Sequence, residues 1–137
     1  LTQDTPVITY KQFKDKFHTI ATFGALEGLD HLKGKNYCII GTPHIHPSTY
    51  LLYATALHLR AKLTLDDMSY DEITWNGFKF WFQSYSDSSN LRELQLFLIE
   101  AELVQAIGRA RLLREECTVI LLSNLPIQGA EFRQLAR

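Results

Sequence analysis

The residues of this chain that could do chemistry are concentrated in one short string, which runs from Gln105 through Gly108 and Arg109 to Arg111. A glycine lets the backbone approach a ligand closely. Two arginines at i and i+2 do not share one helical face, and their spacing favours contacts beyond a helix end. Their guanidinium groups suit phosphate oxygens, which they hold with paired hydrogen bonds. Charge alone would favour a surface helix with solvated arginines, so a phosphate site is here a hypothesis.

Histidines and acids offer a second set of candidates. His44, His46 and His31 are the residue types of a metal site. Imidazoles two residues apart in an extended segment point to opposite sides, and no cysteine or carboxylate is adjacent to complete a ligand set. We therefore predict no metal site, and we expect His44 or His46 to contact nucleic acid or line a cleft, with His44 as the candidate residue. The paired acids Asp66-Asp67 and Asp71-Glu72 are more typical of solvated turns than of general acid–base groups.

Length and composition indicate one globular domain. The chain has 137 residues, of which 46% are apolar and 21% charged, and this excludes a disordered or fibrous protein. Fourteen basic and fifteen acidic residues give a net charge of −1, so a globally basic nucleic-acid binder is not indicated. Neither a membrane-spanning run of about 18 apolar residues nor a secretory signal is visible, and Cys38 and Cys117 suit a reducing compartment. We expect a cytoplasmic location and no membrane partner.

The hydrophobic pattern predicts an α/β fold. Its strand-like stretches are apolar at nearly every position, as in a buried parallel sheet, and helical segments alternate with them. The predicted helix that begins at Pro47 has many apolar residues, and we expect it to be mostly buried. The predicted strands are Val7–Tyr10, Thr19–Phe23, Tyr37–Thr42 and Thr118–Ser123, and the predicted helices are Lys11–His18, Pro47 to about Lys62, Leu91 to about Leu113 and a short one at the end of Asn124–Arg137.

The middle of the chain has a different pattern. Asn76-Gly77 lies between two aromatic-rich runs and predicts a hairpin with a type I′ turn, as an insertion or a sheet edge within about 63–89. Its aromatic side chains could stack on the bases of a single strand. Only Lys79 adds positive charge, so we favour core packing or a partner interface for these side chains, which are Trp75, Phe78, Phe80, Trp81 and Phe82.

The Gln-x-x-Gly-Arg-x-Arg string resembles motif VI of the superfamily 2 helicases and translocases. Its spacing is closest to that of the Dicer and innate RNA-sensor branch. In that superfamily the arginines reach from the second RecA-like lobe onto the γ-phosphate of ATP, which is bound to the first lobe. The resemblance implies that Arg109 and Arg111 are arginine fingers, and that Gln105 and Gly108 lie on the nucleotide side.

A second string, from Ala21 to Asp30, is similar to motif V of the same superfamily. The resemblance implies that Asp30 lies near the nucleotide. The resemblance also implies that several other residues, given at the end of this paragraph, lie along the nucleic-acid strand and the cleft between the lobes. Many relatives have arginine where this chain has Glu27, and this departure weakens a phosphate contact there. The cleft and nucleic-acid candidates are Thr22, Gly24, Gly28, Thr42 and His44.

The order of these motifs is that of a C-terminal RecA-like lobe, and the resemblance covers the chain except for Leu63–Ser89. It implies that residues 1–137 form one RecA-like three-layer domain, the second motor lobe of an ATP-dependent helicase that acts on DNA or RNA. The phosphate-binding loop and the acidic motif of a first lobe are missing. We therefore expect ATP and Mg²⁺ to be bound mainly by a preceding RecA-like lobe of the same polypeptide, and this chain not to hydrolyse ATP alone.

Two further expectations accompany this assignment. The chain starts with Leu1 and not with methionine, which fits a domain excised from a longer protein. The alternative to a motor lobe is a non-catalytic, helicase-like interaction module, in which the aromatic hairpin binds a protein partner.

Overall fold

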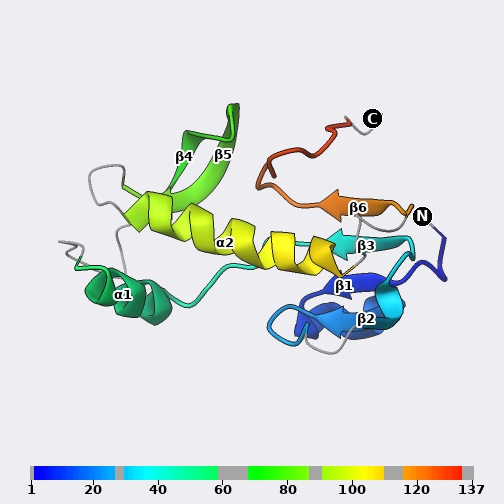
Figure 1. Ribbon diagram of the computed structural model, residues 1–137. Helices are drawn as coiled ribbons and strands as arrows, with labels where there is room; N and C mark the ends of the chain where they lie inside the picture. The colour runs from blue at the N-terminus through cyan, green and yellow to red at the C-terminus, as the bar shows by residue number, and fades with distance from the viewer. Residues whose placement is uncertain (1, 27–29, 59–67, 87–90, 110–115, 134–137) are drawn as a thin grey trace.

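The protein is an α/β structure in which one long helix joins two separate sheets (Figure 1). The structure is a computed structural model that describes residues 2–26, 30–58, 68–86, 91–109 and 116–133. The first sheet contains both the first and the last strand of the chain. The second sheet is the predicted hairpin.

The first sheet has four strands in the order β2-β1-β3-β6, and all of its pairings are parallel. The mainly parallel sheet that the apolar strands predict is thereby confirmed. Ile8 and Ile39 pair in the centre of the sheet and are fully buried. The strands are β1 (Val7–Thr9), β2 (Thr19–Thr22), β3 (Tyr37–Ile40) and β6 (Val119–Leu122).

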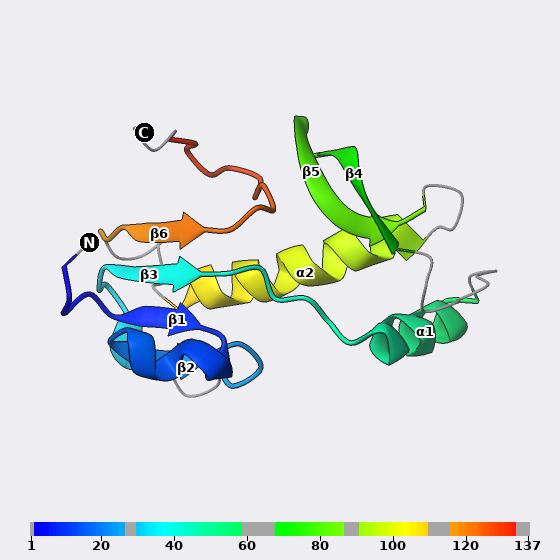
Figure 2. The same cartoon turned by 180° about the vertical axis from the view of Figure 1, so that it is seen from behind.

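Helix α2 (Leu91–Gly108) packs its buried side against both sheets (Figure 2). Leu96, Ile99, Leu103 and Ala106 recur at helical spacing and are at most 2% exposed. They share one core cluster with residues of the parallel sheet and of the hairpin. Each fully buried Leu or Ile stabilises this arrangement by about 1.5–3 kcal/mol. The predicted helix is confirmed up to Gly108, and its expected continuation to Leu113 lies outside the described residues.

The hairpin consists of β4 (Met68–Trp75) and β5 (Phe78–Tyr85). Asn76 and Gly77 have φ of 51° and 81°, as a type I′ turn requires, and the predicted turn is confirmed. Residues alternate between a face that packs on α2 and an exposed face. The two strands form a sheet of their own and no edge of the parallel sheet.

Helix α1 (Pro47–Ala56) begins at an unusual cap. The His46 imidazole accepts a hydrogen bond from the Ser48 backbone N–H at 3.2 Å, and proline follows at the first helical position. The predicted end near Lys62 is wrong, because Leu57 leaves the helix and His58 takes a φ of 54°.

The prediction that α1 is mostly buried is also wrong. Tyr50 and Ala54, four residues apart, are the helix's only buried residues, because α1 packs against the first turns of α2 and Tyr85 of the hairpin and not against the parallel sheet (Figure 1). The large apolar residues of its other faces are exposed, namely Leu51, Leu52 and Tyr53.

The remaining segments are short. The predicted helix over Lys11–His18 is present as the 3₁₀ helix η1 (Lys11–Lys16), and a second 3₁₀ turn, η2 (Asp30–Leu32), precedes β3. Residues 124–133 contain no helix, and the last four residues of the predicted C-terminal one lie outside the described residues. Cys38 is a buried, free thiol in β3.

A close contact fixes the point where the chain leaves β3. The Tyr10 hydroxyl donates to the Thr42 carbonyl and accepts from the Thr42 N–H at 2.8 Å. Gly41, between β3 and Thr42, has a φ of 117°. A Cβ at this glycine would lie 2.4 Å from the Tyr10 ring. Only glycine therefore allows this tyrosine to hold the carboxyl end of β3.

We predict that Gly41→Ala lowers the free energy of unfolding by about 2–5 kcal/mol, through the backbone strain and the clash with Tyr10. Gly24→Ala is the matched control, since Gly24 also has a positive φ (82°) but open space around its Cβ position. It should cost only about 1–2 kcal/mol. Denaturant unfolding of both variants measures the difference, and equal losses would contradict the role of Tyr10.

Candidate functional site

The sequence-predicted site residues lie at two opposite ends of the parallel sheet. Tyr37 is the first residue of β3, and its hydroxyl donates to the carbonyls of Ala106 and Ile107 in the last turn of α2. Thr42 and His44 follow the last residue of β3. The two ends are separated by the length of β3, about 10 Å at 3.3 Å per residue.

Arg109 directly follows α2 at the amino end of β3. Its side chain is half-buried, and its Nε is a buried atom that has no hydrogen-bond partner within the described residues. Gln105 and Gly108 are exposed on the last turns of the helix. The structure therefore places Gln105, Gly108 and Arg109 at one end of α2, where the Arg109 Nε has no hydrogen-bond partner among the described residues.

Three other candidates are placed incompletely. Asp30 begins η2, whose last residue, Leu32, is buried in the same cluster as Leu103 and Ala106 of α2. The backbone of Asp30 thus lies on the same side of the sheet as this part of α2. Gly28 and Arg111 lie outside the described residues.

The remaining candidates lie at or just beyond the carboxyl ends of the strands. Thr22 ends β2, and Gly24 follows it, exposed. Thr42 is buried, and its hydroxyl bonds the Ser123 hydroxyl at 2.7 Å and the Asn124 side-chain oxygen. This hydroxyl joins the ends of β3 and β6, so Thr42 positions the chain around it.

His44 lies over the hairpin at the mouth of a cavity of about 270 Å³. Its ring packs against Phe82, with centroids 5.3 Å apart and planes at 32°. The imidazole is exposed on its other side, yet this partial burial lowers its pKa from the usual 6.5. The imidazole is therefore more readily neutral near pH 7, with one N–H donor and one acceptor.

Gln95, on α2, closes the floor of the cavity and is 1% exposed. Its side-chain oxygen accepts from the Tyr85 N–H at 3.1 Å, and its side-chain nitrogen donates to the Gln83 carbonyl at 3.3 Å. Tyr50 forms part of the wall, and burial raises its pKa to about 12. Gln95 and Tyr50 are therefore both uncharged near pH 7.

Glu100 holds the hairpin against α2. Its carboxylate accepts hydrogen bonds from the Trp75 indole N–H and the Asn76 side-chain amide, both at 2.8 Å. Asn76 also donates to the Pro126 carbonyl at 3.0 Å. One carboxylate therefore positions both the hairpin turn and, through Asn76, the segment after β6.

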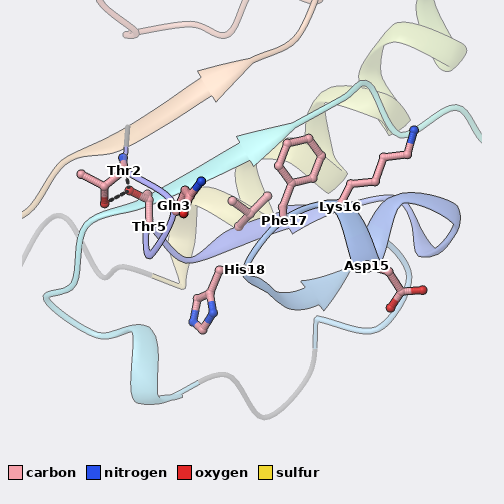
Figure 3. A pocket seen from close by; sticks show the side chains of 8 residues that line it. Thr2, Gln3, Thr5, Asp15, Lys16, Phe17 and His18 are labelled. Carbon is pink, nitrogen blue, oxygen red and sulfur yellow. Dashed lines mark hydrogen bonds between the residues drawn. The ribbon is translucent and has the colours of Figure 1, made fainter.

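A second, more open cavity of about 480 Å³ lies near the amino ends of β1 and β2 (Figure 3). Asp15, Lys16 and His18 lie around it, but their side chains point in different directions (Figure 3). It includes none of the sequence-predicted residues. We therefore do not assign it a function.

No group of three or more His, Cys, Asp or Glu side chains among the described residues is arranged to hold a metal ion. Within the same residues, no helix has the length and apolarity needed to cross a membrane.

Comparison with protein-family models, curated proteins and solved structures finds no match to this chain. The resemblance to the superfamily 2 helicases therefore depends on the sequence motifs alone.

Sequence reasoning missed three residues that shape these sites. Glu100 is in an ordinary amphipathic helix, and nothing in its sequence neighbourhood shows that a hairpin turn reaches it. Gln83 and Gln95 meet at the cavity only through the tertiary fold. The Asn-Gly signal locates the hairpin turn but not the helix that receives it.

We predict that stability depends on the protonation of His44. Because its pKa is lower in the folded chain than in the unfolded one, the unfolded state binds more protons between the folded pKa and about 6.5. Stability should therefore fall as the pH drops through this window. The substitution His44→Phe removes the titrating imidazole, so the free energy of unfolding should depend less on pH between about 7.5 and 5.5. An unchanged pH dependence would contradict the partial burial of this ring.

We predict that Glu100→Gln destabilises the protein by about 1.5–3 kcal/mol, because a charge-assisted acceptor is lost and an amide N–H₂ opposes another donor. Glu102→Gln, two residues along the same helix, is the control, since Glu102 makes no hydrogen bond within the described residues. It should change stability by less than about 0.5 kcal/mol. Thermal unfolding of both variants measures this contrast. Similar losses of stability in the two variants would contradict the role of Glu100 in holding the hairpin against α2.

Proposed function

We propose that this chain is the second, RecA-like motor lobe of an ATP-dependent helicase or translocase. In this proposal the lobe supplies arginine fingers to ATP, which a preceding lobe holds with Mg²⁺. Arg109 and Arg111 stabilise charge on the γ-phosphate, and Gln105, Gly108 and Asp30 contact the nucleotide. Residues at the carboxyl ends of the β-strands contact a strand of DNA or RNA.

The main support for this proposal is the environment of the Arg109 guanidinium. A guanidinium has five N–H donors and suits phosphate oxygens. The Nε of Arg109 is buried without a partner in the described part of the chain, on a half-buried side chain that follows the helix end. A buried donor without a partner costs about 1–3 kcal/mol, and an anion from outside would satisfy it.

The separation of the candidates also supports it. The nucleotide candidates on α2 and η2 lie on the side of Tyr37, where β3 begins. Thr22, Gly24, Thr42 and His44 lie toward the other end of the strands. A motor lobe needs such separate contacts, since it couples the nucleotide to a polymer that lies elsewhere.

The second candidate function is a non-catalytic interaction module. Large apolar side chains on α1 and α2 are exposed, among them Leu52 at 70% and Phe97 at 60%. Such surfaces are typical of protein contacts. A module of this kind would not require the polypeptide to hydrolyse ATP, and this separates the two functions experimentally.

We predict that Arg109→Ala in the complete polypeptide lowers kcat for ATP hydrolysis by a factor of order 10³, since the finger acts in the transition state. Arg109→Lys should restore little, because an ammonium lacks the paired donors of a guanidinium. Arg133→Ala is the control, since Arg133 is 82% exposed and pairs with the nearby Glu131. A kcat that stays unchanged in Arg109→Ala while the fold is intact would exclude the finger.

A further inference from the structure

The hairpin has an open strand edge along β4. Trp75 and Phe78 flank the two-residue turn, so they form a hydrogen-bonded pair. In an antiparallel ladder, hydrogen-bonded pairs alternate with pairs whose backbone groups point outward. The register therefore directs the backbone N–H and C=O groups of Tyr70, Glu72 and Thr74 away from β5. These three residues present a row of backbone donors and acceptors on the outer edge of β4.

The corresponding edge of β5 is covered by a side chain of α2. The Gln95 side-chain oxygen accepts from the Tyr85 N–H, and its side-chain nitrogen donates to the Gln83 carbonyl. The Gln95 amide thus takes the place that a further strand would take beside β5. Among the described residues, no group bonds in this way to the outward-pointing backbone of β4. An open edge of this kind is suited to pairing with another extended chain.

The open edge lies away from the parallel sheet. Figures 1 and 2 show the hairpin projecting from α2, with β4 on the side away from β6 and from the segment that follows β6. The side chains of residues 69–72 are all exposed. No described part of this chain therefore covers the middle of β4.

The charge of β4 is negative. Asp71 and Glu72 are exposed and point to opposite faces of the strand, and β4 contains no Lys or Arg. Neither carboxylate forms an ion pair within the described residues, and Asp71 accepts a hydrogen bond from the Ser69 hydroxyl. Lys79 on β5 is the one cation among the residues of the two strands. A strand added at β4 therefore meets two carboxylates, one on each face.

These carboxylates favour a basic segment over other partners. Opposite charges stabilise a cross-strand pair, and like charges directly opposite each other destabilise it. A second copy of β4, paired antiparallel about Asp71 and Glu72, would bring its own carboxylates against these two. A nucleic acid would bring phosphates of the same sign. An extended peptide with consecutive Lys or Arg residues instead places one cation against each carboxylate.

An aromatic pair adds a preference for one further position. The rings of Tyr70 and Trp81 have centroids 5.7 Å apart and planes at 29°, and the two residues are 62% and 55% exposed. A residue paired with Tyr70 lies on the same face of the sheet as these rings. An aromatic side chain at that position extends the stack, which favours an aromatic residue after the two basic ones.

We propose that the outer edge of β4 binds an extended, basic segment of another protein as an antiparallel third strand of the hairpin sheet. Backbone hydrogen bonds supply the affinity, and Asp71, Glu72 and Tyr70 supply the preference for two basic residues followed by an aromatic one. This interaction goes beyond the proposed motor function and does not depend on it, since none of the nucleotide candidates takes part.

The test uses a fluorescein-labelled peptide, Thr-Val-Lys-Arg-Phe-Thr, whose residues are designed to lie opposite Thr74 through Ser69 in that order. We expect the complete polypeptide, without ATP, to bind it at least tenfold more tightly than Thr-Val-Glu-Glu-Phe-Thr in fluorescence anisotropy. N-methylation of the peptide's Lys and Phe, whose N–H groups face β4, should weaken binding at least tenfold. N-methylation of its Val and Arg, whose N–H groups face away, should weaken binding less than about threefold.

Variants of the chain test the same edge. The double variant Asp71→Asn, Glu72→Gln should bind the basic peptide roughly three- to tenfold more weakly. Asp15→Asn on η1, which removes an exposed carboxylate elsewhere, should bind as the wild type does. Thr74→Pro removes an outward-pointing N–H without changing charge or the hairpin's own hydrogen bonds, and should weaken binding roughly tenfold. Thermal unfolding confirms that each variant is folded.

The contrary results are equally definite. The inference is wrong if no peptide binds, if the basic and acidic peptides bind equally, or if the two N-methylated peptides bind equally. It is also wrong if the polypeptide forms a dimer that Asp71→Asn strengthens, because a second copy then occupies the edge. Arg109→Ala should bind the peptide as the wild type does, so a failure of the motor proposal and a failure of this inference are distinguishable.

Discussion

The structure depends on the packing of one face of α2. Leu96, Ile99, Leu103 and Ala106 bring the parallel sheet and the hairpin into a single core, although the two sheets share no strand pairing within the described ranges. At 1.5 Å per residue the 18-residue helix is about 27 Å long, so it extends beyond a sheet whose strands have four residues or fewer. Its N-terminal half supports the hairpin, and its C-terminal end leads into Arg109.

Helix α2 is attached to the rest of the structure at two points, the hairpin turn and the start of β3. Glu100 fixes the hairpin turn through Trp75 and Asn76, and Tyr37 fixes the last turn of the helix at the start of β3. A shift of the helix would therefore move the hairpin and the arginine together. Both attachments are direct hydrogen bonds to this one helix.

The sequence predicts the regular elements well, because their signals are local. Apolar runs locate all four parallel strands, and Asn76-Gly77 locates the hairpin turn. The extent and burial of α1 are not predicted, because an apolar helix has no sequence signal that tells which partner covers it. Of the hairpin aromatics for which we favour core packing or a partner interface, Trp75, Phe80 and Phe82 pack in or against the core, whereas Phe78 and Trp81 are exposed.

The candidate sites follow the same division between local and tertiary information. The Gly-Arg string singles out Arg109 from residue types alone, but only the fold shows that its Nε is buried without a partner among the described residues. Likewise, His44 is identified from its place after a strand, whereas its ring contact with Phe82 and the cavity beside it require the hairpin to fold back. Tertiary contacts between distant segments decide which side chains share a site.

The rate of ATP hydrolysis by the complete polypeptide, measured with and without single-stranded DNA or RNA, tests whether this lobe is half of a nucleic-acid-dependent motor. If it is, hydrolysis rises when one of these polymers is added. A complete, folded polypeptide that hydrolyses no ATP with either polymer would exclude a motor lobe.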